Sequence, residues 1–167
     1  MASNYDISII RPEVRSYQVR LRYKDIEPIR LKQIRKALMT FHNLEKMAVN
    51  IYRFQISSRN SDELNTELIK AMLNEMTHVQ DFQVKLFEYG ISPSVFATGY
   101  SLLGAVFGFL SHLFGEASIK KMGVWVESKA VSHYGELLES IEWDEDTRKI
   151  IEKDFADENG HINRWKS

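Results

Sequence analysis

The 167-residue sequence contains no cysteine. This absence excludes a disulfide scaffold, an iron–sulfur cluster, a thiolate zinc site and a cysteine nucleophile, and it fits a reducing compartment. Proline is scarce, with only Pro12, Pro28 and Pro93. Few prolines together with long stretches of helical apolar periodicity favour an all-α chain. The length predicts one domain that can bury a core without cross-links.

Net charge is also nearly absent, at −1, which by itself says nothing about nucleic acid. We expect no nucleic-acid partner. The first residues lack a basic segment followed by an apolar one, so no secretory signal is expected. Between residues 11 and 36, however, basic residues outnumber acidic ones. A solvated helix face is the favoured interpretation of this segment, and attraction to anionic lipid is the alternative.

One internal stretch, residues 89–115, has no Asp, Glu, Lys or Arg. Its length would allow a membrane span, but Pro93 and three internal glycines argue against one. A span would also place the helices before and after it on opposite sides of the bilayer. We therefore expect a short apolar crossover helix within residues 95–114, lying on or in a helical bundle. Two roles for it stay open, a core or dimer interface and a face for membrane or apolar substrate.

Four longer helices are predicted around this segment, at residues 28–57, 61–89, 116–140 and 144–165. Pro28 suits the first turn of a helix, Ser61 suits an N-cap, and Gly90 suits a helix end. Residues 1–27 are expected to form an N-terminal arm, strand-like over residues 16–23, that lies on a four-helix bundle formed by residues 28–167.

Each of the four helices carries acidic residues within an otherwise mostly apolar stripe. A Glu and a His three residues apart share one helix face and can bind one metal ion together. Because an unpaired charge on a buried face is costly, a metal ion is a plausible partner. Two such pairs can occur by chance, so the spacing alone is a weak signal. The candidate metal-binding and catalytic residues, in chain order, are Glu45, Glu75, His78, Glu127, Glu158 and His161.

Four carboxylates and two imidazoles form a hard, oxygen-rich ligand set that suits iron or manganese. The order Glu, Glu-x-x-His, Glu, Glu-x-x-His is that of ferritin-like di-iron four-helix bundles. Asp154 and Tyr52 are candidates for fixing the imidazoles from behind, and His133 is a weaker one. His42 and His112 are expected not to be ligands.

The sequence resembles the demethoxyubiquinone hydroxylase family over roughly residues 38–162. The motifs that carry the resemblance lie at residues 42–55, 75–82, 99–115 and 126–134. Leu44 and Met47 stand where that family usually has glycines. Asn159-Gly160 interrupts a last motif that is usually rich in Glu and His.

The resemblance implies a di-iron monooxygenase that uses O2 to hydroxylate a demethoxy-polyprenyl-benzoquinol in ubiquinone biosynthesis. It implies two iron ions, with a reduced nicotinamide as one candidate electron donor. It also implies peripheral association of residues 95–114 with the inner face of the cell membrane, on the cytoplasmic side, and a homodimer is one candidate assembly. The main alternative is a rubrerythrin- or ferritin-like protein that detoxifies peroxide or stores iron. The other is a metal-free bundle whose apolar face binds a partner.

Overall fold

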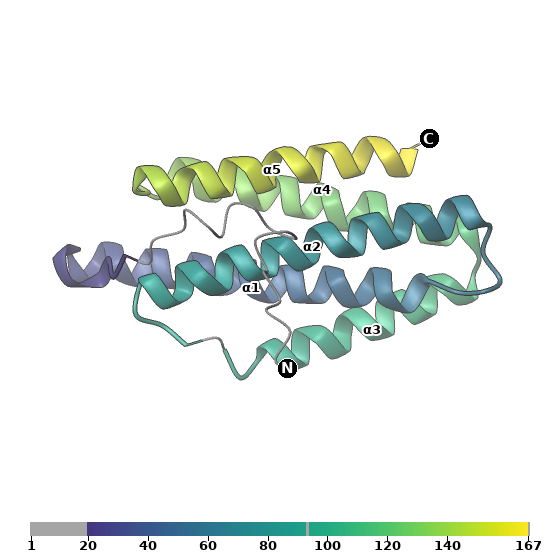
Figure 1. The fold of residues 1–167 in the computed structure, drawn as a ribbon, viewed down its shortest axis with the longest axis horizontal. Coiled ribbons are helices and arrows are strands. Elements are labelled where there is room, and N and C mark those ends of the chain that lie inside the picture. Colours follow the sequence, from purple (N-terminus) through teal and green to yellow (C-terminus); the bar gives the residue numbers. More distant parts are fainter. Residues whose placement is uncertain (1–19, 93, 167) are drawn as a thin grey trace, which may run out of the picture.

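The computed structural model describes residues 20–92 and 94–166, and within these ranges the fold is entirely helical. This confirms the predicted all-α fold class. The structure has four long helices and a shorter one, and Figure 1 shows the shorter helix, α3, beneath the others. Their bounds are α1 Pro28–Gln55, α2 Asp62–Glu88, α3 Ala97–Leu113, α4 Glu116–Ser140 and α5 Glu145–Lys166.

The helix boundaries follow local signals in the sequence. Pro28 is the first residue of α1, and the preceding Glu27 side chain accepts a hydrogen bond from the Arg30 backbone N–H at 2.9 Å. Ser61 caps α2 by accepting from the Leu64 N–H at 3.2 Å. Gly90 has φ +71° just beyond α2, a conformation that glycine adopts without strain. The helix predicted to reach residue 57 ends at Gln55.

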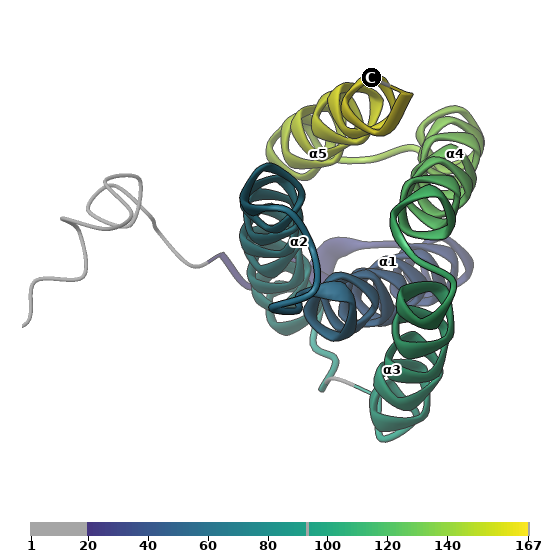
Figure 2. The same cartoon turned by 90° about the vertical axis from the view of Figure 1, so that its right-hand side faces the viewer.

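Helices α1, α2, α4 and α5 surround a common interior, which Figure 2 shows end-on. This interior has two apolar layers, and the predicted metal ligands lie between them in every helix. One layer contains Ile34, Leu38, Phe41, Phe82, Leu86, Tyr134 and Ile151. The other contains Ile51, Tyr52, Leu64, Leu68, Ile119, Val126 and Trp165. The apolar layers thus fix the helices on both sides of a polar centre.

Helix α3 is the crossover that the sequence predicted. Because α2 and α4 run in the same direction, the chain must return along the bundle between them, and α3 makes this return packed mainly against α1. Its contact face consists of small residues. A Cβ at Gly104 would lie 2.2 Å from the Met47 carbonyl oxygen, and one at Gly108 would lie 2.3 Å from that of Ile51. Glycine therefore allows the two helices to approach this closely.

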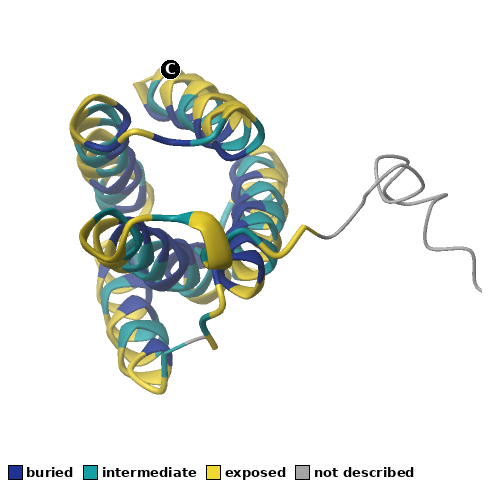
Figure 3. Ribbon diagram, turned by 90° about the vertical axis from the view of Figure 1, so that its left-hand side faces the viewer, coloured by how far each residue is buried: buried dark blue, intermediate teal, exposed yellow. Residues whose placement is uncertain are grey.

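The outer side of α3 is apolar and exposed (Figure 3). The exposed large apolar residues of this helix and its flanks are Val95, Phe96, Leu102, Leu103, Val106, Phe109, Leu110, Leu113 and Phe114. We call this set the α3 outer face. In the described ranges, no helix combines the length and apolar character that a bilayer crossing requires.

The end of the predicted arm lies on the bundle. Its described part contains a 3₁₀ turn, Tyr23–Asp25, and no strand, so the strand predicted for residues 16–23 is wrong over residues 20–23. Residues 1–19 lie outside the described ranges. The Arg22 guanidinium pairs with Glu88, Asp144 and Asp146 at 2.8–2.9 Å, joining the end of α2 to the start of α5. A domain boundary at residue 27 stays a prediction.

Several arginines of the basic segment, residues 11–36, make ion pairs or hydrogen bonds to other parts of the chain. Besides Arg22, the Arg30 side chain donates to the Glu142 carbonyl at 2.6 Å, and the Arg35 side chain donates to the Tyr89 carbonyl at 3.0 Å. These contacts favour the interpretation of this segment as an ordinary helix face over that of a lipid-binding patch.

Candidate metal centre

The structure brings all six predicted ligands together in the middle of the bundle. Each side chain is buried, with exposed fractions between 0% and 3%. Their donor atoms form two groups, each within 4.8 Å. We call the group of Glu45, Glu75, His78 and Glu158 the Glu45 position, and the group of Glu75, Glu127, Glu158 and His161 the Glu127 position. Glu75 and Glu158 belong to both groups, so two ions could share these carboxylates.

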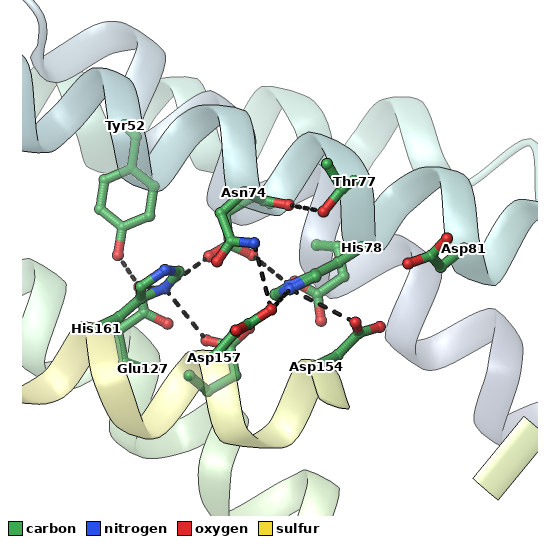
Figure 4. A network of polar contacts seen from close by, with 12 residues as sticks. Tyr52, Asn74, Thr77, His78, Asp81, Glu127, Asp154, Asp157 and His161 are labelled. Atoms are coloured by element: carbon green, nitrogen blue, oxygen red, sulfur yellow. Dashed lines mark hydrogen bonds and ion pairs between the residues drawn. The ribbon is translucent and has the colours of Figure 1, made fainter. Parts of the chain in front are cut away.

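Both imidazoles turn Nδ1 toward the carboxylates (Figure 4). His78 Nδ1 lies 3.1 Å from Glu158 Oε1 and 3.4 Å from Glu75 Oε2. His161 Nδ1 lies 3.1 Å from Glu75 Oε1 and 3.3 Å from Glu127 Oε1. The spacing of three residues within each Glu-x-x-His pair produces this arrangement, because it places both side chains on one helix face.

Most of these donor atoms are buried and make no hydrogen bond. They are both carboxylate oxygens of Glu75 and of Glu158, Oε2 of Glu127, and Nδ1 of His78 and of His161. Buried polar groups are rarely left without a partner, because desolvation without a new bond is costly. A cation among these atoms would satisfy them together. The residues present therefore fit a metal ion at each position.

The electrostatics of the cluster also indicate a missing positive charge. Burial raises the pKa of Glu45 to about 8. Burial and the nearby charges of Glu75 and Glu127 hold the pKa of Glu158 well above its usual range. Burial lowers the pKa of His161, but the carboxylates of Glu127 and Glu75 outweigh it and raise the value to about 9. Glu75 is the exception, because burial raises its pKa but the two nearby imidazoles outweigh this effect and hold the pKa below the usual range. The other groups favour their protonated forms without a metal, and a bound cation would displace these protons.

Two tyrosine hydroxyls donate hydrogen bonds to the carboxylates that each belong to only one metal position, Glu45 and Glu127. Tyr134 of α4 donates a hydrogen bond of 2.6 Å to Glu45 of α1, and Tyr52 of α1 donates one to Glu127 of α4. The expectation that Tyr52 fixes an imidazole is corrected here, because its partner is a carboxylate. The sequence reasoning missed Tyr134. The spacing of seven residues in both Glu45–Tyr52 and Glu127–Tyr134 was the signal that could have found it.

Carboxylates also lie behind one imidazole. Asp154, predicted for this role, has Oδ1 3.7 Å from His78 Nε2. Asp157 is closer, with Oδ2 at 3.3 Å, and it was missed although it directly precedes Glu158. Figure 4 shows both reaching from α5 toward α2. His133, the weaker candidate, belongs to neither metal position, and its ring contacts Phe41 with centroids 5.7 Å apart.

A cavity of about 230 Å³ lies between α1 and α4 and reaches the carboxylates. Its wall is mostly apolar and includes Phe41, Met47, Trp125, Ala130 and His133. Four of the ligand candidates, Glu45, Glu75, Glu127 and Glu158, line its inner end. The cavity could therefore bring an apolar molecule beside the metal positions.

The residues Asn159-Gly160, which stand between Glu158 and His161, leave α5 unbroken. The Asn159 side chain donates to the Phe155 carbonyl at 3.0 Å, one turn earlier on the same helix. Apart from its chain neighbours and the adjacent backbone of α5, no described atom lies within 4 Å of a Cβ placed on Gly160. The departure from the family pattern thus does not displace His161 from the site.

The family model described as ubiquinone biosynthesis protein COQ7 matches residues 32–164. The chain belongs to the COQ7 family. This confirms the resemblance noted in the sequence and assigns the protein a role in ubiquinone biosynthesis. The match includes all six ligand candidates and α3. A comparison with individual curated proteins gave no match.

Proposed function

We propose that this COQ7 family member is an O2-dependent di-iron hydroxylase that acts on the ring of a demethoxy-polyprenyl-benzoquinol. The observation that carries the proposal is the set of buried donor atoms without hydrogen-bond partners on five of the six ligand candidates. Four carboxylates and two imidazoles suit iron, and bound iron would supply the activation of O2. A reduced nicotinamide is the proposed source of electrons.

The side chains of this site have distinct roles in the proposal. Glu75 and Glu158 would hold both ions, since each belongs to both positions. Glu45 and Glu127 would each hold one ion, and the tyrosine hydroxyl behind each carboxylate fixes its orientation. Such outer hydrogen bonds orient the ligands of a metal. The burial of the whole cluster excludes bulk water from the reacting groups.

The cavity between α1 and α4 is the proposed site of the quinol ring. Its volume of about 230 Å³ is smaller than the roughly 300–1,000 Å³ of pockets that enclose a drug-sized ligand. It therefore suits a ring without a long polyprenyl tail. The tail would lie outside the cavity, where Trp125 of the cavity wall contacts Phe107 of α3 with ring centroids 6.5 Å apart.

The α3 outer face is the proposed contact with the bilayer. This face lies next to the cavity and has no charged residue. The proposed substrate of the enzyme is a membrane lipid. Contiguous exposed apolar surface of this kind marks interaction sites. Peripheral contact through α3 would let a quinol move from the bilayer into the cavity without the protein spanning the membrane.

The reaction is tested by anaerobic loading with Fe(II), followed by O2 together with a short-chain demethoxyquinol or with hydrogen peroxide. We expect hydroxylated quinone as the product. Peroxide turnover with unchanged quinol would instead identify a rubrerythrin- or ferritin-like protein. A protein that binds no iron at neutral pH would refute both.

The ligand assignment is tested by Glu75→Ala and His161→Ala. Glu75→Ala should abolish iron binding, because Glu75 belongs to both positions, and His161→Ala should remove the ion of the Glu127 position, while the far-ultraviolet circular dichroism of the helices persists. Glu152→Gln is a matched control, because Glu152 is an exposed carboxylate on α5 that pairs with Arg148 at 2.7 Å. Two iron ions per chain in either ligand variant would overturn the assignment.

Membrane contact is tested by flotation with phosphatidylcholine vesicles. Phe109→Glu should reduce binding, whereas Leu73→Glu on α2 should not. The two positions are similarly exposed, at 51% and 53%, so the comparison isolates the α3 outer face. A dimer that persists without vesicles and is broken by Phe109→Glu would instead identify this face as a homodimer interface.

A further inference from the structure

The metal centre has an internal two-fold pattern. The pair Glu45 and Tyr52 of α1 corresponds to Glu127 and Tyr134 of α4, and each tyrosine hydroxyl bonds the carboxylate of the opposite pair. The Glu-x-x-His pair of α2 corresponds to that of α5 in the same way. If the pattern were complete, the Glu45 and Glu127 positions would have identical surroundings.

The pattern is broken behind the imidazoles. Asp157 directly precedes Glu158, and the corresponding residue before Glu75 is Asn74. Asp154 lies four residues before Glu158, and the corresponding residue before Glu75 is Ala71. The α5 helix therefore presents two carboxylates where α2 presents an amide and a methyl group.

Asp157 and Asp154 lie against His78 and not against His161. His78 Nε2 lies 3.3 Å from Asp157 Oδ2 and 3.7 Å from Asp154 Oδ1. Asp154 is fully buried, and its Oδ2 has no hydrogen-bond partner. Among residues 20–92 and 94–166, the carboxylates paired with the His161 ring are those of the ligand candidates Glu75, Glu127 and Glu158, each through Nδ1.

A carboxylate behind a ligating imidazole changes how that imidazole binds metal. When Nδ1 holds the ion, Nε2 carries the proton and donates it in a hydrogen bond. A carboxylate acceptor fixes the ring and makes it a stronger ligand, and loss of such a partner typically weakens metal affinity about 10- to 100-fold. Asn74 supports the acceptor, because its amide donates to Asp157 Oδ2 at 3.4 Å.

We propose that Asp157, assisted by Asp154, positions His78 so that the Glu45 position binds its metal more tightly than the Glu127 position and fills first. The proposal rests on the two-metal site of the proposed function. Asp157 and Asp154 form a third group with His78, whose donor atoms also lie within 4.8 Å of one another. The proposal assigns both as positioning residues, because they face His78 Nε2, whereas Nδ1 faces the carboxylates of the Glu45 position.

The test is titration of the metal-free protein with Co(II), followed by visible absorption and calorimetry. We expect two phases of unequal affinity in the wild type. His78→Ala should remove the tighter phase, and His161→Ala should remove the weaker one. Asp157→Asn should weaken the tighter phase about 10- to 100-fold and change its cobalt spectrum, with the weaker phase unchanged. Asp154→Asn should have a smaller effect of the same kind.

Asp81→Asn is the matched control. Asp81 pairs with Lys153 at 3.3 Å, near the same site, so the variant makes the same change of charge without removing a carboxylate behind His78. It should leave both phases as in the wild type. Two equivalent cobalt ions in the wild type, or equal weakening of both phases in Asp157→Asn, would overturn this inference alone. A wild-type protein that binds no cobalt would overturn the proposed function as well.

Discussion

Replacement of Gly108 by alanine tests the close contact between α3 and α1. A Cβ at this position would lie 2.3 Å from the Ile51 carbonyl oxygen, whereas ordinary contacts begin at 3.4 Å. Because the oxygen belongs to the backbone of a helix, the two helices would have to separate by about 1 Å. Overpacking of this kind costs about 1–3 kcal/mol.

Helix propensity acts in the opposite direction. Alanine in a helix is favoured over glycine by about 0.5–1 kcal/mol. We therefore expect Gly108→Ala to lower the free energy of unfolding by up to about 2.5 kcal/mol. Gly135→Ala is the control, because Gly135 lies within α4 and its added Cβ would meet no atom within 4 Å beyond its chain neighbours and the adjacent backbone of its own helix. This variant should gain stability from propensity alone.

The assay is urea denaturation of both variants beside the wild type. The gain in helix propensity is common to Gly108→Ala and Gly135→Ala. The difference between their free energies of unfolding therefore measures the clash alone and should be about 1–3 kcal/mol. Gly99→Ala, in open space at the start of α3, controls for effects specific to that helix. Equal stability of Gly108→Ala and Gly135→Ala would refute the close approach of α3 to α1. A double variant with Gly104→Ala should lose less than the sum of the two changes, because one separation of the helices relieves both clashes.

Two further predictions concern side chains that act across helices. Tyr134→Phe removes the hydroxyl that donates to Glu45, so we expect about 10-fold weaker Co(II) binding at the Glu45 position, measured by titration, with an unchanged helical signal. Arg22→Met removes the hydrogen bond that lowers the pKa of Asp146. A lowered folded-state pKa adds stability above about pH 4, and this stability is lost as the pH falls. The urea midpoint should therefore fall less between pH 7 and pH 3 in this variant than in the wild type, and an equal fall would contradict the role of Arg22.

The helices and the residues of the metal centre could be predicted from the sequence because their signals are local. Pro28, Ser61 and Gly90 mark helix ends through their own backbone preferences. The candidate ligands stand out because each is a polar residue on an apolar stripe of its own helix. The structure places all of them in one cluster, and their role as ligands stays a proposal.

The partners behind the ligands could not be predicted in the same way. Tyr134 lies on the helix of Glu127 but bonds Glu45, 89 residues away in the sequence. Asp157 contacts His78 across a helix interface, 79 residues away. Such contacts depend on how neighbouring helices are rotated against each other, which apolar periodicity does not fix. The ion pairs of Arg22 with α2 and α5 were missed for the same reason.

The topology of the bundle explains why the uncharged segment was ambiguous. A helix that returns along the outside of a bundle ordinarily buries its large apolar residues and exposes polar ones. In α3 the buried residues are small, namely Ala97, Gly104, Gly108 and Ser111, and the large apolar residues point outward. A sequence that is apolar on all sides indicates a buried or membrane-bound helix, and periodicity cannot distinguish the two. Packing among the described residues accounts for the small residues and for Phe107, which contacts Trp125. The exposed large ones are the reason that the α3 outer face, which lies beside the cavity, is proposed above as the contact with the bilayer.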